Sequence, residues 1–411
     1  MTDGTSMGIR NSYPRLRVSG SPRERGQAYG ELARERIQRC RAAYEDVFAL
    51  TVGWDWAQAV ASAARYEAPI REFAPEVMQE IEGIAEGSGL PAGDVLAINA
   101  RTEIIWAASA RTAAAQRTDL ARECTALAVT GRRTEAGRLL LAQNWDWLVH
   151  SFDTVVVLEV EQPGDRPNFV TVVEAGLLAK ASMNSAGLGV VTNALVTSED
   201  RGEPGIPYHV MLRLLADQLT VTDALKLVQA TTRASSANYL IAHADDVAVN
   251  VEAGPGDFRA LGWQLPRDGR LVHTNHFLSL PRGLDEVSVY AMPDSLVRLQ
   301  RAEAALDEAS GGWDVKAIGE LLADHADWPS AVCCHPDPRE QSALRWATVM
   351  SVVMDLAAGQ LWLASGNPCT QPFEALSLGE LLDKPSPLAR ARPDAGGIGT
   401  APGQPQFVSH E

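Results

Sequence analysis

The chain contains few cysteines and no N-terminal apolar segment of the kind that directs export. Five of its 411 residues are cysteine, an odd number. The first residues, MTDGTSMGIRNSYPRLRVSG, lack the apolar core of a secretory signal peptide. Because disulfides persist mainly in secreted proteins, we expect five free thiols and a cytoplasmic location.

Long apolar runs and an excess of positive charge are also missing. No run reaches the roughly 18 apolar residues that a membrane-spanning helix needs. The chain has 36 Lys and Arg against 52 Asp and Glu, a formal net charge of −16. Nucleic acids and anionic membranes both require a basic surface on the protein that binds them. We therefore exclude nucleic acid and membrane as main partners.

The residue pattern divides the chain into a helical part and a β-rich part. Roughly the first 106 residues are predicted to be helical, with a helix start at Ser21 and Pro22. Residues 107–123, AASARTAAAQRTDLARE, are small and charged, which is compatible with the tail of a helix and also typical of a mobile, protease-accessible linker. From Cys124 onward, short β-branched runs separated by Gly, Asp and Pro predict antiparallel strands, with two helical blocks between them.

Cys124 heads the first of these strands, and its thiol is a candidate nucleophile. Only the thiolate attacks, and the unperturbed pKa of a cysteine is about 8.5, so the thiol needs a base. A histidine could serve, although the spacing of the eight histidines selects none of them. If the chain were cut before Cys124, the new α-amino group, with a pKa of about 7.7–8.0, could serve instead. A buried structural cysteine is the remaining interpretation.

Five motifs occur in an order that matches one enzyme family. They are SGSPRERGQAYGELARERI, ECTALAV followed by GRLLLAQNWDW, MNSAGLGVVTNAL, HTNHF, and LRWATVMSVVMDLAAGQLWLASGNPC. In this order they resemble the acyl-coenzyme A:6-aminopenicillanate (isopenicillin N) acyltransferase family of N-terminal nucleophile (Ntn) hydrolases. The resemblance extends from residue 17 to about residue 375.

The resemblance implies an α+β fold, the four-layer αββα sandwich of antiparallel sheets. It implies one domain over residues 1–411, whereas length alone would favour two or three. It also implies self-cleavage between Glu123 and Cys124 into an α-chain, 1–123, and a β-chain, 124–411, that remain associated. The tail 384–411 is rich in Pro, Gly and Ala and is predicted to be disordered.

The same resemblance implies roles for particular residues. Cys124 would be the nucleophile of both self-cleavage and catalysis. Asp146 would hydrogen-bond the freed α-amine, and Asn275 would donate to the oxyanion. An arginine would line the site, either Arg345 or its competitor Arg339. By analogy with the related bile-salt and penicillin V amidases, Asn193 is a further candidate donor.

Histidines and cysteines elsewhere in the chain suggest a zinc site as an alternative interpretation. HTNH places His273 and His276 three residues apart, and CCH covers Cys333–His335. The two histidines of HTNH lie at a predicted strand end, where this spacing does not converge on a metal. We therefore expect neither a metal nor another cofactor.

The chemistry implied is acyl transfer from a linear amide of a small molecule through a Cys124 thioester. The substrate would be an acylated amine, an acylated amino acid or a peptide-like metabolite, with an acyl-coenzyme A as a further candidate. Whether water or an amine accepts the acyl group stays open, and so does the formation of a homo-oligomer. Two other functions are compatible with the sequence: a papain-like Cys/His hydrolase without self-cleavage, and a non-catalytic protein that binds small metabolites.

Overall fold

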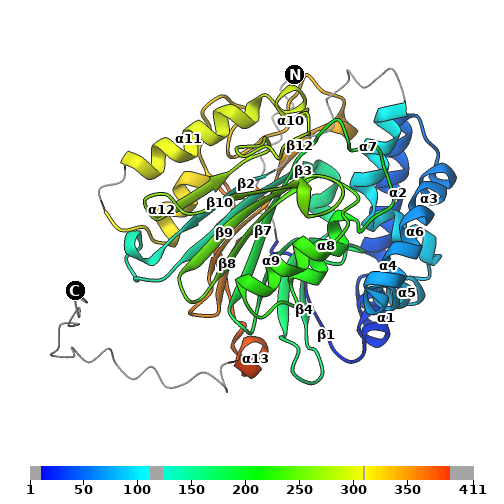
Figure 1. Ribbon diagram of the computed structural model, residues 1–411, viewed down its shortest axis with the longest axis horizontal. Helices are drawn as coiled ribbons and strands as arrows, with labels where there is room; N and C mark the ends of the chain where they lie inside the picture. The colour runs from blue at the N-terminus through cyan, green and yellow to red at the C-terminus, as the bar shows by residue number, and fades with distance from the viewer. Residues whose placement is uncertain (1–10, 112–123, 309–310, 389–411) are drawn as a thin grey trace, which may run out of the picture.

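The computed structural model describes residues 11–111, 124–308 and 311–388 (Figure 1). Glu123, residues 112–122 of the expected linker, and residues 389–411 of the expected tail lie outside the described residues. Self-cleavage before Cys124 and disorder of that tail therefore stay predictions. Within the part of the tail that is described, Lys384 donates from Nζ to the carbonyl of Gln162 at 2.5 Å.

Seven helices occupy the N-terminal part of the described chain, as the sequence predicts. They are α1 (Pro22–Leu32), α2 (Arg34–Val52), α3 (Trp56–Ala63), α4 (Glu67–Phe73), α5 (Pro75–Ser88), α6 (Ala92–Asn99) and α7 (Arg101–Arg111). The expected start of α1 is confirmed: Ser21 caps the helix, and Glu24 completes a reciprocal capping box. Helix α7 continues to Arg111, so the first five residues of the expected linker, 107–111, are helical. For these five residues the helical alternative holds, since small residues such as Ala also favour helix.

Glycines bring α1 and α5 into very close contact. A Cβ added to Gly87 of α5 would lie 2.0 Å from the carbonyl oxygen of Gln27, and one added to Gly26 of α1 would lie 2.3 Å from that of Glu80. No larger residue fits at such distances. This explains the glycine-rich start of the N-terminal motif.

Two β-sheets form the centre of the molecule. The larger sheet has the order β1-β4-β5-β6-β7-β8-β9-β10, with β1 parallel to β4 and all other neighbours antiparallel. Its strands are β1 (Arg15–Val18), β4 (Val155–Val160), β5 (Phe169–Glu174), β6 (Ala181–Asn184), β7 (Leu188–Ala194), β8 (Ala237–His243), β9 (Val247–Ala253) and β10 (Leu261–Gln264). Strand β1 lies within the segment predicted to be helical, and this difference corrects the prediction.

The smaller sheet is antiparallel throughout and has the order β11-β2-β3-β12-β13-β14. Its strands are β2 (Thr125–Val129), β3 (Leu140–Leu148), β11 (Arg270–His273), β12 (Trp346–Asp355), β13 (Gln360–Ala364) and β14 (Glu374–Leu376). The hairpin predicted across residues 357–359 is confirmed, since Asp355 pairs with Gln360.

The two sheets pack against each other, and helices cover both outer faces (Figure 1). Helices α1–α7, together with α8 (Tyr208–Leu215) and α9 (Val221–Ala230), lie on the side of the larger sheet. Helices α11 (Asp294–Glu308) and α12 (Val315–Leu322) cover the smaller sheet, and two short helices, α10 (Ser288–Ala291) and α13 (Gly379–Leu382), complete the described set. The α+β class and the αββα layering are therefore confirmed.

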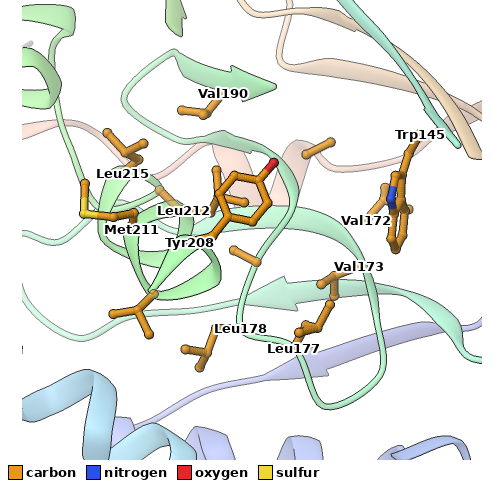
Figure 2. Close-up of a cluster of buried hydrophobic side chains, with 14 of the residues drawn as sticks. Trp145, Val172, Val173, Leu177, Leu178, Val190, Tyr208, Met211, Leu212 and Leu215 are labelled. Carbon is orange, nitrogen blue, oxygen red and sulfur yellow. The ribbon is translucent and has the colours of Figure 1, made fainter. Parts of the chain in front are cut away.

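Buried apolar side chains fill the spaces between the layers. Figure 2 shows one such cluster, to which α8 contributes Tyr208 and Met211, β5 contributes Val172 and β3 contributes Trp145. Strands β2 and β3 are buried on both faces, as expected for a layer between a sheet and helices. Along β2, Ala126 and Ala128 belong to the large core, while Leu127 and Val129 pack in the cluster beneath α11 and α12. Cys124 belongs to the same large core as Ala126 and Ala128, so this face of the strand points toward the larger sheet.

No described helix is both long and apolar enough to cross a lipid bilayer.

Candidate active site

Cys124 lies fully buried immediately before β2. Its φ is +66°, in the left-handed region that a residue with a Cβ rarely adopts. This conformation costs about 1–2 kcal/mol. The carbonyl oxygen of Cys124 accepts hydrogen bonds from Asn193 Nδ2 and from Arg298 Nη1, both at 2.9 Å. These two donors, from opposite sides of the smaller sheet, hold the strained residue in place.

Asp146 lies on the neighbouring strand at the same end of the sheet. Thr125 pairs with Asn144, so the antiparallel register brings Cys124 to the level of residues 145 and 146. The Asp146 carboxylate is buried and accepts a hydrogen bond from Thr348 Oγ1 at 2.6 Å. Thr348 Oγ1 in turn accepts from the backbone N–H of Cys334 at 2.8 Å. The carboxylate is therefore fixed by a chain of contacts from β12 and the loop before it.

The two predicted asparagines are buried in the same region. Asn193, on β7, donates from Nδ2 to the carbonyls of Cys124 and His273, the latter at 3.2 Å. Asn275 follows β11 and donates from Nδ2 to the carbonyl of Ala194 at 3.1 Å. Both amides thus bind backbone carbonyls in this arrangement. An amide nitrogen carries two N–H donors, so Asn193, with two acceptors, would have to give one up to donate to an oxyanion, whereas Asn275 has a second N–H beside the one bound to Ala194. Both roles stay predictions.

Arg298, on α11, completes the group and was not identified from the sequence. Besides the carbonyl of Cys124, it donates to Asn275 Oδ1 at 2.8 Å and to Asp294 Oδ2 at 2.9 Å. Burial alone would lower its pKa, but the charges of Asp294 and Asp146 raise it, so it is a fixed cation beside the Asp146 carboxylate. In the sequence, Asp294 and Arg298 look like an ordinary i,i+4 helix pair, and that spacing gives no sign of their position in the fold.

The side chains of Arg345 and Arg339 make their hydrogen bonds within the loop before β12. Arg345 donates to the carbonyls of Glu340, at 3.2 Å, and Pro338, at 3.4 Å. The Arg339 side chain is 79% exposed and pairs with Asp337 at 2.6 Å. Neither set of contacts involves Cys124, Asp146 or the two asparagines. The proposed role of an arginine from this loop stays a prediction for both residues.

The histidines of HTNH have separate partners. His273 contacts Glu252 Oε1 through Nε2 and the carbonyl of Thr274 through Nδ1, each at 2.7 Å. His276 contacts Ser295 Oγ through Nδ1 at 2.8 Å. Burial, His273 and Arg298 lower the pKa of His276 to about 4, so it is neutral at pH 7. Engaged in this way, His273 could act as a base for a thiol only after losing one of its two contacts.

This arrangement of cysteine, aspartate, asparagines and arginine can be compared with known families. The family model of acyl-coenzyme A:6-aminopenicillanic acid acyl-transferase matches residues 132–370, more than half of the chain. The chain belongs to this family. The resemblance found in the sequence motifs is therefore confirmed, and the protein is an enzyme of the acyltransferase and amidohydrolase class. The matched segment begins after Cys124 and contains Asp146, Asn193, Asn275 and Arg298.

The chain is similar to one curated protein and to solved structures of two other enzymes. The chain is 27% identical over 357 residues to the acyl-coenzyme A:6-aminopenicillanic-acid-acyltransferase 40 kDa form of Emericella nidulans, which covers 85% of this chain and 91% of the relative. Among solved structures, a variant of conjugated bile acid hydrolase from Clostridium perfringens aligns with 14% identity and a TM-score of 0.44, over 62% of this chain and 93% of that one. Penicillin V acylase from Agrobacterium tumefaciens aligns with 13% identity and a TM-score of 0.41, over 63% and 87% of the two chains.

In this member of the acyltransferase family, a buried ionic network supports the strand that carries Asp146. Glu174 of β5 forms an ion pair with Arg101 of α7 and accepts from the hydroxyl of Tyr44 at 2.7 Å. The Arg101 guanidinium lies 4.1 Å from the ring centroid of Trp147, and Trp147 Nε1 donates to the Tyr44 hydroxyl at 2.7 Å. Trp147 directly follows Asp146, so the network fixes β3 at the site.

Replacing Glu174 by Gln is expected to lower the free energy of unfolding by about 3–5 kcal/mol, because the Arg101 charge would remain buried without its partner. Thermal and denaturant unfolding measure the change. Glu161→Gln is the matched control, since its pair with Arg17 is at the surface, with side-chain exposures of 39% and 43%. Loss of such a pair costs about 0–1 kcal/mol. Equal losses in the two variants would contradict the prediction.

The same network predicts a difference in acid stability. Burial alone would raise the pKa of Glu174, but Arg101 and His150 outweigh it and lower the pKa from 4.5 to about 2. A lowered folded-state pKa stabilises the protein above the unfolded value and loses that contribution as the pH falls. Between pH 4.5 and pH 2 we therefore expect the stability difference between wild type and Glu174→Gln to shrink.

Proposed function

We propose that this protein is a self-cleaving Ntn enzyme whose mature nucleophile is the N-terminal thiol of Cys124. The observation that carries the proposal is the position of Cys124: buried at the head of β2, in a left-handed conformation, with its carbonyl held by Asn193 and Arg298. A strained residue held by several partners is typical of a functional position. Family membership supports the same conclusion.

In the self-cleavage step, the Cys124 thiol attacks the carbonyl carbon of Glu123. The C–N bond breaks as the C–S bond forms, and the nitrogen takes a proton to become the α-amine of Cys124. Water then hydrolyses the thioester, leaving a carboxyl group on Glu123 and a free thiol on Cys124. The new amine, with an ordinary pKa of about 7.7–8.0, can accept the thiol proton in later turnovers. The uncleaved chain is inactive in this scheme because that nitrogen is still part of an amide.

In the catalytic step, the thiolate attacks the carbonyl carbon of a small-molecule linear amide. The amine leaves with a proton, the acyl group stays on Cys124 as a thioester, and water or a second amine removes it. Asp146 would hold the α-amine, Asn275 would donate its second amide N–H to the oxyanion, and Asn193 would do so after releasing one of its two acceptors. Arg298 positions both the Asn275 amide and the Cys124 backbone.

The proposed substrates follow from the name of the relative. The Emericella nidulans enzyme is named for acyl-coenzyme A and 6-aminopenicillanic acid. We extend this to an acylated amine, amino acid or peptide-like metabolite, with an acyl-coenzyme A as an acyl donor. No disulfide joins any of the five cysteines, all of which lie in the described part of the chain, and this supports a cytoplasmic location.

Intact mass spectrometry of the purified wild-type protein tests the proposal. We expect two fragments whose masses meet at the Glu123–Cys124 bond. After incubation with an acyl-coenzyme A and acid quenching, the fragment that begins with Cys124 should gain the mass of one acyl group. A single chain that acquires no acyl group would contradict both parts of the proposal. A single chain that acquires one would support a thiol enzyme without self-cleavage.

A further inference from the structure

Four potential metal ligands meet on the smaller sheet's side of the molecule, apart from the residues described above. His325 follows α12, Cys333 and His335 lie in the loop before β12, and Cys369 follows β13. Their ligand atoms all lie within 4.8 Å of one another. Two of the four, Cys333 and His335, belong to the CCH motif, while the HTNH histidines have other partners. The group therefore differs from the zinc site considered from the sequence.

Four of the six separations between these atoms fit one tetrahedral zinc ion, and the other two, from His325 to the sulfur atoms, are at most 4.8 Å. Cys333 Sγ and Cys369 Sγ are 3.6 Å apart, and the Nε2 atoms of His325 and His335 are 3.1 Å apart. His335 Nε2 is 3.5 Å from Cys333 Sγ and 3.4 Å from Cys369 Sγ. Bonds of about 2.3 Å to sulfur and 2.0–2.1 Å to nitrogen place tetrahedral ligands about 3.8 Å (S–S), 3.3 Å (N–N) and 3.5 Å (S–N) apart. The four distances agree with these values to within about 0.2 Å.

The chemistry of the four groups also favours zinc. Two thiols and two imidazoles form a Cys₂His₂ set, which suits Zn²⁺ better than Mg²⁺ or Ca²⁺. A second layer of contacts is present as well, because Asn367 Nδ2 lies 3.6 Å from Cys333 Sγ and donates to the carbonyl of Cys334 at 2.6 Å.

We propose that His325, Cys333, His335 and Cys369 bind one Zn²⁺ ion as a structural site. Four protein ligands complete the tetrahedron, so the ion has no position for a water or a substrate and is not catalytic. It ties the loop between α12 and β12, which holds His325, Cys333 and His335, to Cys369 in the turn after β13. This proposal departs from our expectation of no metal.

The site also has a direct connection to the Asp146 carboxylate. Cys334, next to the ligand Cys333, donates its backbone N–H to Thr348 Oγ1, and Thr348 donates to Asp146. A metal that fixes the loop therefore fixes the partner of Asp146. This consequence rests on the proposed function of Asp146, whereas binding of the ion does not.

The first test is the metal content of the untagged full-length chain, measured by inductively coupled plasma mass spectrometry after growth with zinc in the medium. We expect about one zinc per chain in the wild type and less than about a tenth of that in Cys333→Ser/Cys369→Ser. Cys40→Ala is the control, because it removes a buried thiol far from the cluster in sequence and should leave the zinc content unchanged. Cys369→Ser alone, at a surface position, provides a milder variant should the double variant fail to fold.

The second test replaces zinc with cobalt(II), whose visible absorption reports tetrahedral thiolate coordination. We expect that absorption in the wild type and in Cys40→Ala, and its loss in Cys369→Ser. A wild-type chain that contains no zinc and binds no cobalt would overturn the proposal. Equal zinc content in the wild type and the double variant would also overturn it. So would a metal-free wild-type chain whose mass is lower by two hydrogens because Cys333 and Cys369 form a disulfide. These readouts do not depend on chain cleavage or acyl transfer, so they succeed or fail separately from the proposed function.

Discussion

The Cys124→Ala variant is expected to accumulate as one full-length chain and to lose acyl-transfer activity by roughly 10⁴-fold or more. Alanine has no nucleophile, so neither the N-to-S shift at Glu123 nor a substrate thioester can form. The residue is fully buried with its backbone held by Asn193 and Arg298, and loss of one sulfur atom leaves those backbone contacts in place. Intact mass and an amide-hydrolysis assay, run beside the wild type, measure both effects.

Two further variants separate the loss of the nucleophile from the loss of a buried sulfur atom. Cys40→Ala removes another fully buried thiol, and it should be cleaved and remain active. Cys124→Ser keeps a weaker nucleophile and should be cleaved more slowly than the wild type. Cleavage of Cys124→Ala at the wild-type rate would rule out self-processing by this thiol.

Replacing Arg298 by Met is expected to reduce kcat by about 10²–10³-fold, the range seen when one preorganised polar group is removed from an active site. The guanidinium holds the Cys124 carbonyl and the Asn275 amide, and it places a positive charge near Asp146. Methionine fills similar space but provides none of these contacts. Steady-state kinetics should show the loss mainly in kcat, with KM changing little.

The control for this prediction lies on the same helix. Arg301→Met removes an arginine whose side chain is 47% exposed and whose ion pair is with Asp324, so its effect on kcat should be small. Arg298→Lys keeps the positive charge but cannot form the several hydrogen bonds of a guanidinium. Its kcat should therefore lie between those of the wild type and Arg298→Met. Because Arg298 is buried beside Asp294, unfolding curves must accompany the kinetics. If folded Arg298→Met had wild-type kcat, the positioning role would be ruled out.

The sequence alone determined those features that depend on nearby residues. The Ser21 cap of α1, the hairpin between β12 and β13, and most helices of the N-terminal part follow from local patterns of caps, turns and apolar spacing. The motif order gave the family and, through it, the αββα layering. Strand β1, RLRV, does alternate charged and apolar residues, but it was missed because four residues are a short run and its partner strand, β4, is distant in sequence.

Only the tertiary structure decided which distant residues meet. Arg298 reaches Cys124 across 174 positions of sequence, and Glu174 meets Arg101 across 73. Three ligands of the proposed zinc site lie within residues 325–335, but the fourth, Cys369, follows β13, so no short motif contains the whole set. Local patterns record the conformational preferences of neighbouring residues, whereas these contacts depend on how sheets and helices pack. The sequence therefore indicated the proposed nucleophile, Cys124, and its strand, while the packing of α11 and the loop before β12 determined what surrounds it.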